Sequence, residues 1–177
     1  MTMKLKLYHA GLSVIYTPDI RRGRKNADFG PGFYLTPDRD FAVRWAGKDA
    51  VINAYELDTE GLDIRRLDRD ADWFRYIFSN RRGKDTLDAD VIIGPIANDT
   101  IFDTLGILTS GYLDPEKALR LLRIGPAYTQ AAVKTDRAVS RLRWTGSETA
   151  DSGKDNTEEQ KAYLEQFAAE LAKMEAE

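Results

Sequence analysis

The strongest constraint on the fold is a continuous apolar run at residues 89–96, ADVIIGPI. A run of this length that ends at Gly-Pro is typical of a strand buried in a core. KLKLYH at 4–9 and AVINAYELD at 50–58 alternate along the chain as strands do, and AYTQAAVKT at 127–135 and GFYLT at 32–36 are also strand-like. The chain is therefore expected to build several short strands.

Segments with helical patterns lie between these strands. Thr36-Pro37 fits an N-cap followed by proline at the first helical position, which predicts a helix over residues 37–47. Phe41 and Trp45 are four residues apart in it and would share one face.

Further helices follow along the chain. Residues 70–82 predict an amphipathic helix with a buried face, residues 97–111 a loop or cap leading into a helix, and Asp114-Pro115 the start of another. A short helix and a final strand-like LRW come after residue 135. The buried face of the 70–82 helix would carry Trp73, Phe74, Ile77 and Phe78. Strands and helices interspersed in this way predict an α+β fold without regular βαβ units.

Domain organisation follows from length and from a change in composition near residue 145. A chain of 177 residues favours one domain, here placed at residues 1–145. Residues 146–156 hold turn formers and charges with almost no apolar side chain, which predicts a flexible linker. Residues 157–177 contain an amphipathic helix that either folds back on its own domain or docks on a partner protein. Its apolar face would carry Tyr163, Leu164, Phe167, Ala168 and Leu171.

Composition excludes several classes of function. There is no cysteine and His9 is the single histidine, so a disulfide, a thiolate zinc site and a cysteine nucleophile are excluded and no metal is expected. Residues 1–145 carry a net charge of +3, well short of a dedicated nucleic-acid binder, and residues 146–177 carry −6. No apolar run is long enough for a signal peptide or a membrane span. We therefore expect a cytoplasmic protein that does not contact a membrane.

Three residues far apart in the sequence form an ordered set. His9 ends the first strand in LYHAG, Tyr34 lies in DFGPGFYLT, and Gln130 begins a late strand in YTQAAVKT. This order resembles the ADP-ribosyltransferases of the diphtheria-toxin and poly(ADP-ribose) polymerase type, whose signature is His, Tyr, Glu. DFGPGFYLT together with VIIGPIANDTI resembles more closely a family of small bacterial domains of uncharacterised function related to those transferases. The resemblance covers residues 4–145 and implies a split β-sandwich with peripheral helices.

The resemblance also implies roles for individual residues. His9 would hydrogen-bond the nicotinamide-side ribose of NAD, and the backbone of Ala10, where glycine is usual, would hold the carboxamide. Tyr34 would stack on the nicotinamide ring, with Trp45 as a second aromatic wall. Gln130 stands where the pattern has a glutamate, so the charge that would assist bond cleavage is missing there. The catalytic set implied is His9, Tyr34 and Gln130.

Loop residues complete the implied NAD site. Arg24, in a basic loop, would meet the pyrophosphate, and Asn98 or Asp99 would supply the missing carboxylate or polar group. Gly30 and Gly32 would let the backbone approach the dinucleotide. The implied cofactor-binding residues are His9, Ala10, Gly11, Gly32, Tyr34, Trp45, Arg24, Asn98 and Asp99, and no metal takes part.

Each of these residues also has a purely structural interpretation. His9 would then only bond a neighbouring carbonyl, Tyr34 and Trp45 would pack in the core, and Asn98 or Asp99 would cap a helix. The functional hypothesis is an NAD-dependent mono-ADP-ribosyltransferase, a glycosyltransferase that passes ADP-ribose to an unidentified protein or nucleic acid and acts as a bacterial toxin or defence component. The alternative is a catalytically degenerate module that binds NAD or ADP-ribose, or an interaction protein.

Overall fold

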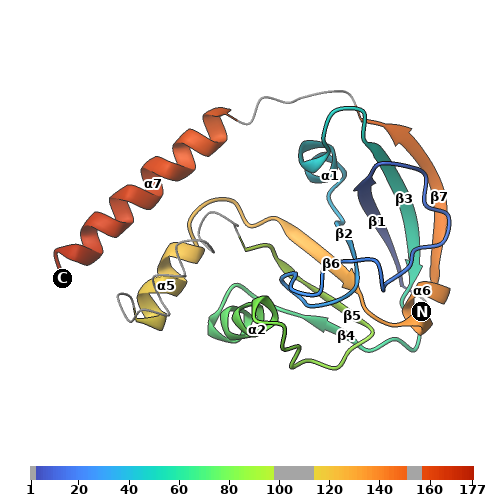
Figure 1. Ribbon diagram of the computed structural model, residues 1–177, viewed down its shortest axis with the longest axis horizontal. Helices are drawn as coiled ribbons and strands as arrows, with labels where there is room; N and C mark the ends of the chain where they lie inside the picture. The colour runs from blue at the N-terminus through green and yellow to red at the C-terminus, as the bar shows by residue number, and fades with distance from the viewer. Residues whose placement is uncertain (1–2, 98–113, 151–156) are drawn as a thin grey trace.

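The computed structural model describes residues 3–97, 114–150 and 157–177. These ranges form two mostly antiparallel sheets and five helices, the α+β class that the sequence predicts (Figure 1). The first sheet has the strand order β1 (Lys4–Gly11), β3 (Val51–Asp58), β7 (Leu142–Thr149). The second has the order β2 (Phe33–Leu35), β6 (Thr129–Val133), β5 (Val91–Pro95), β4 (Ile64–Arg66), in which only β4 and β5 are parallel. The helices are α1 (Arg39–Trp45), α2 (Ala71–Arg81), α5 (Pro115–Leu122), α6 (Asp136–Ser140) and α7 (Thr157–Glu175).

The position of β5 explains its uninterrupted apolar sequence. Val91 and Ile93 point into the core between the two sheets, where they join Leu7 and Leu57 of the first sheet. Ile92 points to the opposite face, which α2 covers with Trp73 and Ile77. All three β5 side chains are buried because the strand has packed layers on both faces. β4, which pairs with β5, was not predicted.

A short seam joins the two sheets. Tyr8 of β1 and Thr36, directly after β2, exchange backbone hydrogen bonds of 2.8 and 2.9 Å. The His9 ring lies beside this seam and bonds the carbonyl of Tyr34 at 2.7 Å. The ends of β1 and β2 are therefore held side by side.

The N-terminus of α1 differs from the prediction. Asp38, and not Thr36, is the N-cap, and its side chain accepts from the Phe41 N–H at 3.1 Å. The Thr36 hydroxyl is already used, because it accepts from Asp38 N and donates to the Thr129 carbonyl. The helix thus begins two residues later than predicted. Phe41 and Trp45 do share one face, with ring centroids 5.8 Å apart.

The buried face of α2 is largely as predicted. Trp73, Phe74 and Ile77 are buried, and the Trp73 indole donates to the Pro95 carbonyl at 2.8 Å. Phe78 was wrongly placed among them, because it is only half-buried and Arg82 lies over its ring at 4.2 Å. Tyr76 is buried in addition.

The linker begins later than the sequence predicts. Residues 146–149 belong to β7, whose backbone pairs with β3 as far as Thr149, and Ala150 N bonds the Ala50 carbonyl at 2.8 Å. An edge strand can be polar on its outer face because the ladder is made by backbone groups. The polar composition of this segment therefore concealed a strand. The predicted segment 97–111, apart from Ala97, lies outside the described residues.

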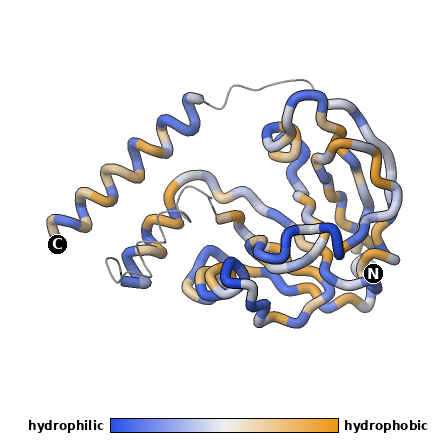
Figure 2. Tube along the Cα trace, viewed as in Figure 1, coloured by the Kyte–Doolittle hydropathy of each residue, from blue (hydrophilic) through white to orange (hydrophobic). Residues whose placement is uncertain are grey.

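Helix α7 packs on its own chain. Tyr163 and Met174 are buried, and Phe167 packs against the apolar cluster that contains Tyr163. Arg120 of α5 pairs with Glu170 at 2.7 Å. Figure 2 shows hydrophobic and hydrophilic positions alternating along this helix. The predicted face is partly wrong, since Leu164 is 48% exposed and Ala168 is exposed. The covered stripe is rotated toward Met174.

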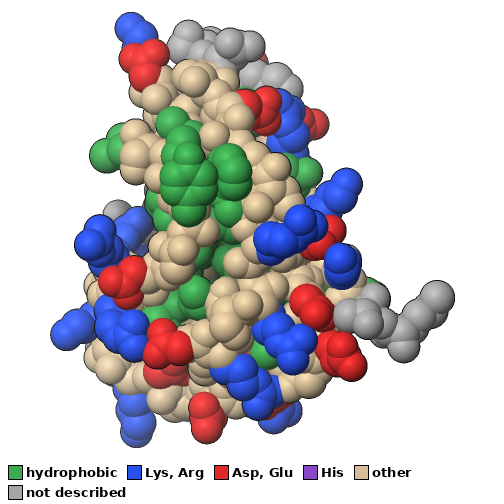
Figure 3. All heavy atoms as spheres, turned by 90° about the vertical axis from the view of Figure 1, so that its right-hand side faces the viewer, with side chains coloured by type: hydrophobic (Ala, Val, Ile, Leu, Met, Phe, Trp, Pro, Cys, Tyr) green, Lys and Arg blue, Asp and Glu red, His purple; other side chains and the backbone are tan. Residues whose placement is uncertain are grey.

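The face of the molecule that carries the loop after β1 has an apolar patch. Leu12, Val14 and Tyr16 are exposed, and the Tyr16 ring meets Trp144 of β7 edge-on at 4.7 Å. Figure 3 shows hydrophobic side chains gathered on this face with charged groups around them. Tyr16 is thus an exposed aromatic residue outside the cavity described next.

Candidate functional site

A cavity of about 230 Å³ lies beside the seam between the sheets. It receives side chains from β1, β2, α1, α2, β6 and the loop before β2. Six of the residues predicted for the site line it, namely His9, Ala10, Arg24, Tyr34, Trp45 and Gln130. Gly11 and Gly32 are not among the lining residues, and Asn98 and Asp99 lie outside the described part of the chain.

The hydrogen bond made by His9 fixes the state of its ring. Its Nδ1 lies 2.7 Å from the Tyr34 carbonyl oxygen, which can only accept, so Nδ1 carries the proton. Burial lowers the pKa of His9, and the bond to Tyr34 raises it by a smaller amount. The imidazole is therefore neutral at pH 7, and its Nε2 is left as a hydrogen-bond acceptor. The structural interpretation of His9 holds for one nitrogen and leaves the other available.

The ring of Tyr34 is held at its outer end. Its hydroxyl accepts from the Phe29 N–H at 2.9 Å and donates to the Gly30 carbonyl at 2.6 Å. Burial is the main cause that raises the pKa of Tyr34, so the phenol stays protonated. The side chain is thus a fixed neutral wall of the cavity and neither an acid nor a nucleophile.

Trp45 forms an exposed rim. Its side chain is 61% exposed, so core packing does not account for it. Phe41 connects it to a further aromatic residue, because the Phe41 and Tyr128 rings stack with centroids 4.4 Å apart. Phe41 and Trp45 therefore give this cavity an aromatic side, and Tyr128 continues it into a neighbouring cavity.

Asp28 is the site residue that the sequence did not reveal. It is 5% exposed and lines the cavity. Its Oδ1 accepts from Arg81 Nε and Nη2 at 3.0 and 2.6 Å, and its Oδ2 accepts from Ala97 N at 3.0 Å and Gln130 Nε2 at 3.1 Å. Burial raises the pKa of this carboxyl above its ordinary value, and the lowering effects of Arg81, Ala97 and Gln130 offset only part of that rise. Its one sequence signal was its place as the first residue of DFGPGFYLT, a motif to which no role for the carboxylate was assigned.

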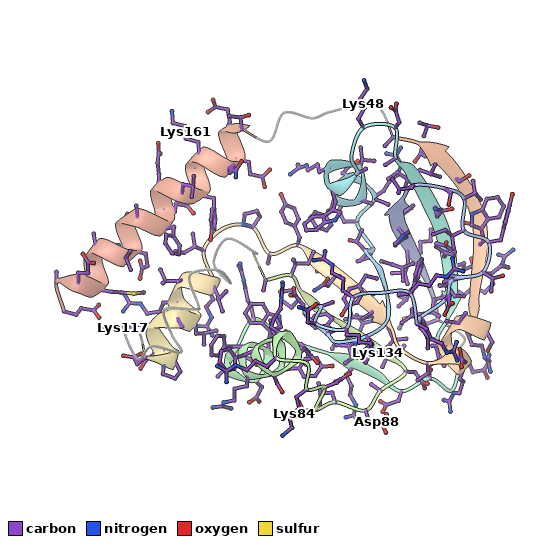
Figure 4. The ribbon with its side chains drawn as sticks, viewed as in Figure 1. Lys48, Lys84, Asp88, Lys117, Lys134 and Lys161 are labelled. Atoms are coloured by element: carbon purple, nitrogen blue, oxygen red, sulfur yellow. The ribbon has the colours of Figure 1, made fainter. Side chains whose placement is uncertain are left out.

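The roles of Gly30 and Gly32 are explained by the fold of the protein itself, without a ligand. A Cβ on Gly32 would lie 2.8 Å from the Val133 carbonyl, so its close approach is to β6. Gly30 has φ of 75°, a conformation that favours glycine. Lys134, labelled in Figure 4, secures the same loop by donating to the Phe29 and Pro31 carbonyls and pairing with Asp85 at 2.6 Å.

The basic loop divides into two parts. Arg21 pairs with Asp136 at 2.6 Å and Arg22 approaches Asp19 at 3.6 Å. Arg24 is exposed and lines the cavity. Arg24, the residue predicted to meet the pyrophosphate, therefore lies at the cavity, whereas Arg21 and Arg22 lie beside acidic side chains.

A second cavity of about 360 Å³ adjoins the first. Phe41, Trp45 and Ile96 line both, and the far side of the second is formed by Tyr163 and Leu164 of α7. Glu159 fastens α7 there, because it pairs with Arg44 at 2.9 Å and accepts from the Tyr128 hydroxyl. The two cavities form one groove with Trp45 at the junction.

Residues 3–97, 114–150 and 157–177 contain no cluster of three or more histidine or acidic side chains suited to a metal ion. The helices described there are all too short or too polar to cross a membrane.

A family model described as "Protein of unknown function (DUF3990)" matches residues 5–144. No curated protein and no solved structure gives a significant match.

Proposed function

We propose that this chain, which belongs to the DUF3990 family of proteins of unknown function, is an NAD-dependent mono-ADP-ribosyltransferase with an ADP-ribosyltransferase-like split β-sandwich fold. One observation carries the proposal. His9, Tyr34, Trp45 and Gln130, from four different elements, line the same cavity, in the order that the resemblance implies and with Gln130 in place of its glutamate.

The chemistry of these groups fits the nicotinamide end of NAD. The free Nε2 of His9 would accept a hydrogen bond from a ribose hydroxyl. Tyr34 and the exposed Trp45 offer aromatic surfaces for the nicotinamide ring, each contact worth about 0.5–1.5 kcal/mol beyond burial. A cavity of 230 Å³ is below the size usual for a complete ligand site, so the remainder of the dinucleotide would extend out of it past Arg24, which would lie near the phosphates.

The reaction would break the bond between C1′ of the ribose and the nicotinamide nitrogen. The electron pair of that bond leaves with nicotinamide, which becomes neutral, and the sugar acquires oxocarbenium character. A nucleophile of the acceptor then bonds to C1′ and loses its proton. The second cavity, beyond Trp45, is the side from which we expect a protein or nucleic-acid acceptor to approach.

A second candidate is a module that binds NAD or ADP-ribose without cleaving it. Gln130 favours it, because the amide is neutral and is hydrogen-bonded to Asp28. The cavity would then keep the recognition groups and lack the charge at this position.

Nicotinamide release and NAD binding separate the two candidates. The transferase should release nicotinamide from NAD, and His9→Ala should abolish release, whereas Tyr16→Ala, an exposed aromatic change outside the cavity, should not. Binding by calorimetry without release would support the binding module. Neither binding nor release, with a folded protein, would refute both.

A further inference from the structure

The cavity contains one carboxylate among its described lining residues, that of Asp28. Gln130 is neutral, but its Nε2 donates to Asp28 Oδ2 at 3.1 Å. We propose that Asp28 supplies the negative charge that stabilises the ribosyl cation, with Gln130 aligning the sugar against it. The inference rests on the proposed function, and it locates the charge in the loop before β2 instead of in β6 or in the segment after β5.

Hydrogen-bond donors around Asp28 stabilise its negative charge although the side chain is buried. Two donors from Arg81 hold Oδ1, while one backbone and one amide donor hold Oδ2. Hydrogen bonds of this kind are what an ionised carboxyl needs when water is excluded. Arg81 offsets part of this charge from the Oδ1 side. Burial leaves the ionised form less stabilised than in water, so a cation forming in the same cavity would still be attracted to it.

Holding the loop does not require this carboxylate. The Asp28 carbonyl accepts from Asn80 Nδ2 at 3.0 Å, and the Tyr34 hydroxyl bonds Phe29 N and the Gly30 carbonyl. The Phe29 carbonyl accepts from both Tyr76 and Lys134. The backbone at residues 28–31 is thus fixed by several side chains that do not depend on the Asp28 charge.

The pairing with Asp28 also orients Gln130. Because the Gln130 amide nitrogen donates to Asp28, its carbonyl oxygen remains an acceptor for a ribose hydroxyl. A hydroxyl bonded there would continue a chain through the amide to the carboxylate, and such chains polarise along their length. As the C1′–nitrogen bond breaks and its electron pair leaves with nicotinamide, the developing positive charge on the sugar is opposed by Asp28.

The test uses the full chain in four forms: wild type, Asp28→Asn, Gln130→Glu and the double variant Asp28→Asn/Gln130→Glu. Nicotinamide release from NAD gives kcat, and calorimetry gives the dissociation constant for NAD. Two inert probes are compared in parallel: an ADP-linked hydroxypyrrolidine, whose protonated ring carries the charge of the ribosyl cation, and its neutral cyclopentane counterpart.

We expect Asp28→Asn to lower kcat by about 100- to 1,000-fold, the usual loss for one electrostatic group, with the NAD dissociation constant unchanged. Wild type should prefer the pyrrolidine by on the order of 100-fold, the lower end for transition-state analogues. Asp28→Asn should lose that preference and the double variant should regain part of it. Gln130→Glu alone should not raise kcat, because its new carboxylate would share a proton with Asp28.

Different results would overturn the inference. A wild-type kcat retained by Asp28→Asn, or equal weakening of NAD and both probes, would leave Asp28 a structural residue. If Asp28→Asn fails to fold, the affinities of the wild type for the two probes are the test. A wild type that binds both probes equally well would refute the role of Asp28. A wild type that neither binds nor cleaves NAD would instead refute the proposed function itself.

Discussion

Replacing Gln130 by glutamate would place a second carboxylate beside Asp28, and the outcome can be worked from the structure. The Gln130 Nε2 lies 3.1 Å from Asp28 Oδ2. Two unit charges at that separation repel by about 5 kcal/mol at an effective dielectric constant of about 20, which corresponds to roughly 4 pKa units. This value is an upper bound, because Arg81 already compensates Asp28.

The new carboxyl therefore takes up a proton in the folded protein that it lacks when unfolded, where its pKa is about 4.3. A folded pKa raised above the unfolded one gives stability that is present at low pH and lost as pH rises. Relative to wild type, Gln130→Glu should lose about 2–4 kcal/mol of unfolding free energy between pH 5 and pH 8. Each kcal/mol lowers Tm by about 2–4 °C in a chain of this size.

Thermal unfolding of both proteins at pH 5 and pH 8 measures this difference. Asp28→Asn/Gln130→Glu is the matched control, since it keeps a single carboxylate. The difference between its Tm and that of the wild type should vary much less with pH. If the Tm difference between Gln130→Glu and wild type is the same at both pH values, Asp28 is not an ionised neighbour of position 130. The negative charge assigned to Asp28 would then be wrong.

Three further predictions test the cavity. Trp45→Ala should weaken NAD binding by about 0.5–1.5 kcal/mol and leave Tm unchanged, because Trp45 is 61% exposed; calorimetry that finds no change, or an equal effect of Tyr16→Ala, would remove Trp45 from the site. Gly32→Ala should lower the unfolding free energy by about 1–3 kcal/mol in denaturant titrations, since its Cβ would lie 2.8 Å from a β6 carbonyl, whereas Gly47→Ala meets nothing within 4 Å and should be neutral; equal stabilities would contradict this packing. NAD affinity should be constant above pH 7 and fall on acidification with a midpoint below 6.5, because protonation of His9 removes the Nε2 acceptor; a calorimetric affinity that rises on acidification would exclude this role.

The elements that could be predicted were those whose apolar pattern matches the faces that they bury. β1 and β3 alternate because one face meets the core, and β5 is continuously apolar because both faces are covered. β4 escaped prediction because its three residues are mostly exposed and are set in place only by pairing with β5. The composition of these three residues does not indicate that they pair with β5.

The residues of the candidate site also include some that a sequence pattern reveals and one that it does not. His9, Tyr34 and Gln130 were found through an ordered motif, and they line one cavity. Asp28 could not be found from the sequence, because its importance comes from Arg81, Ala97 and Gln130, which reach it only in the folded chain. A buried carboxylate and a solvated one look alike in a sequence.

The seam between Tyr8 and Thr36 has a consequence for how such a site can diverge. Two backbone bonds and the His9–Tyr34 contact fix the frame of the cavity without using the side chain at position 130 or 45. Substitutions at these positions can therefore alter the chemistry inside a frame whose dimensions stay the same. Under the proposed function, single substitutions inside this frame would separate a protein that cleaves its ligand from one that only binds it, and each would leave a folded protein for selection to act on.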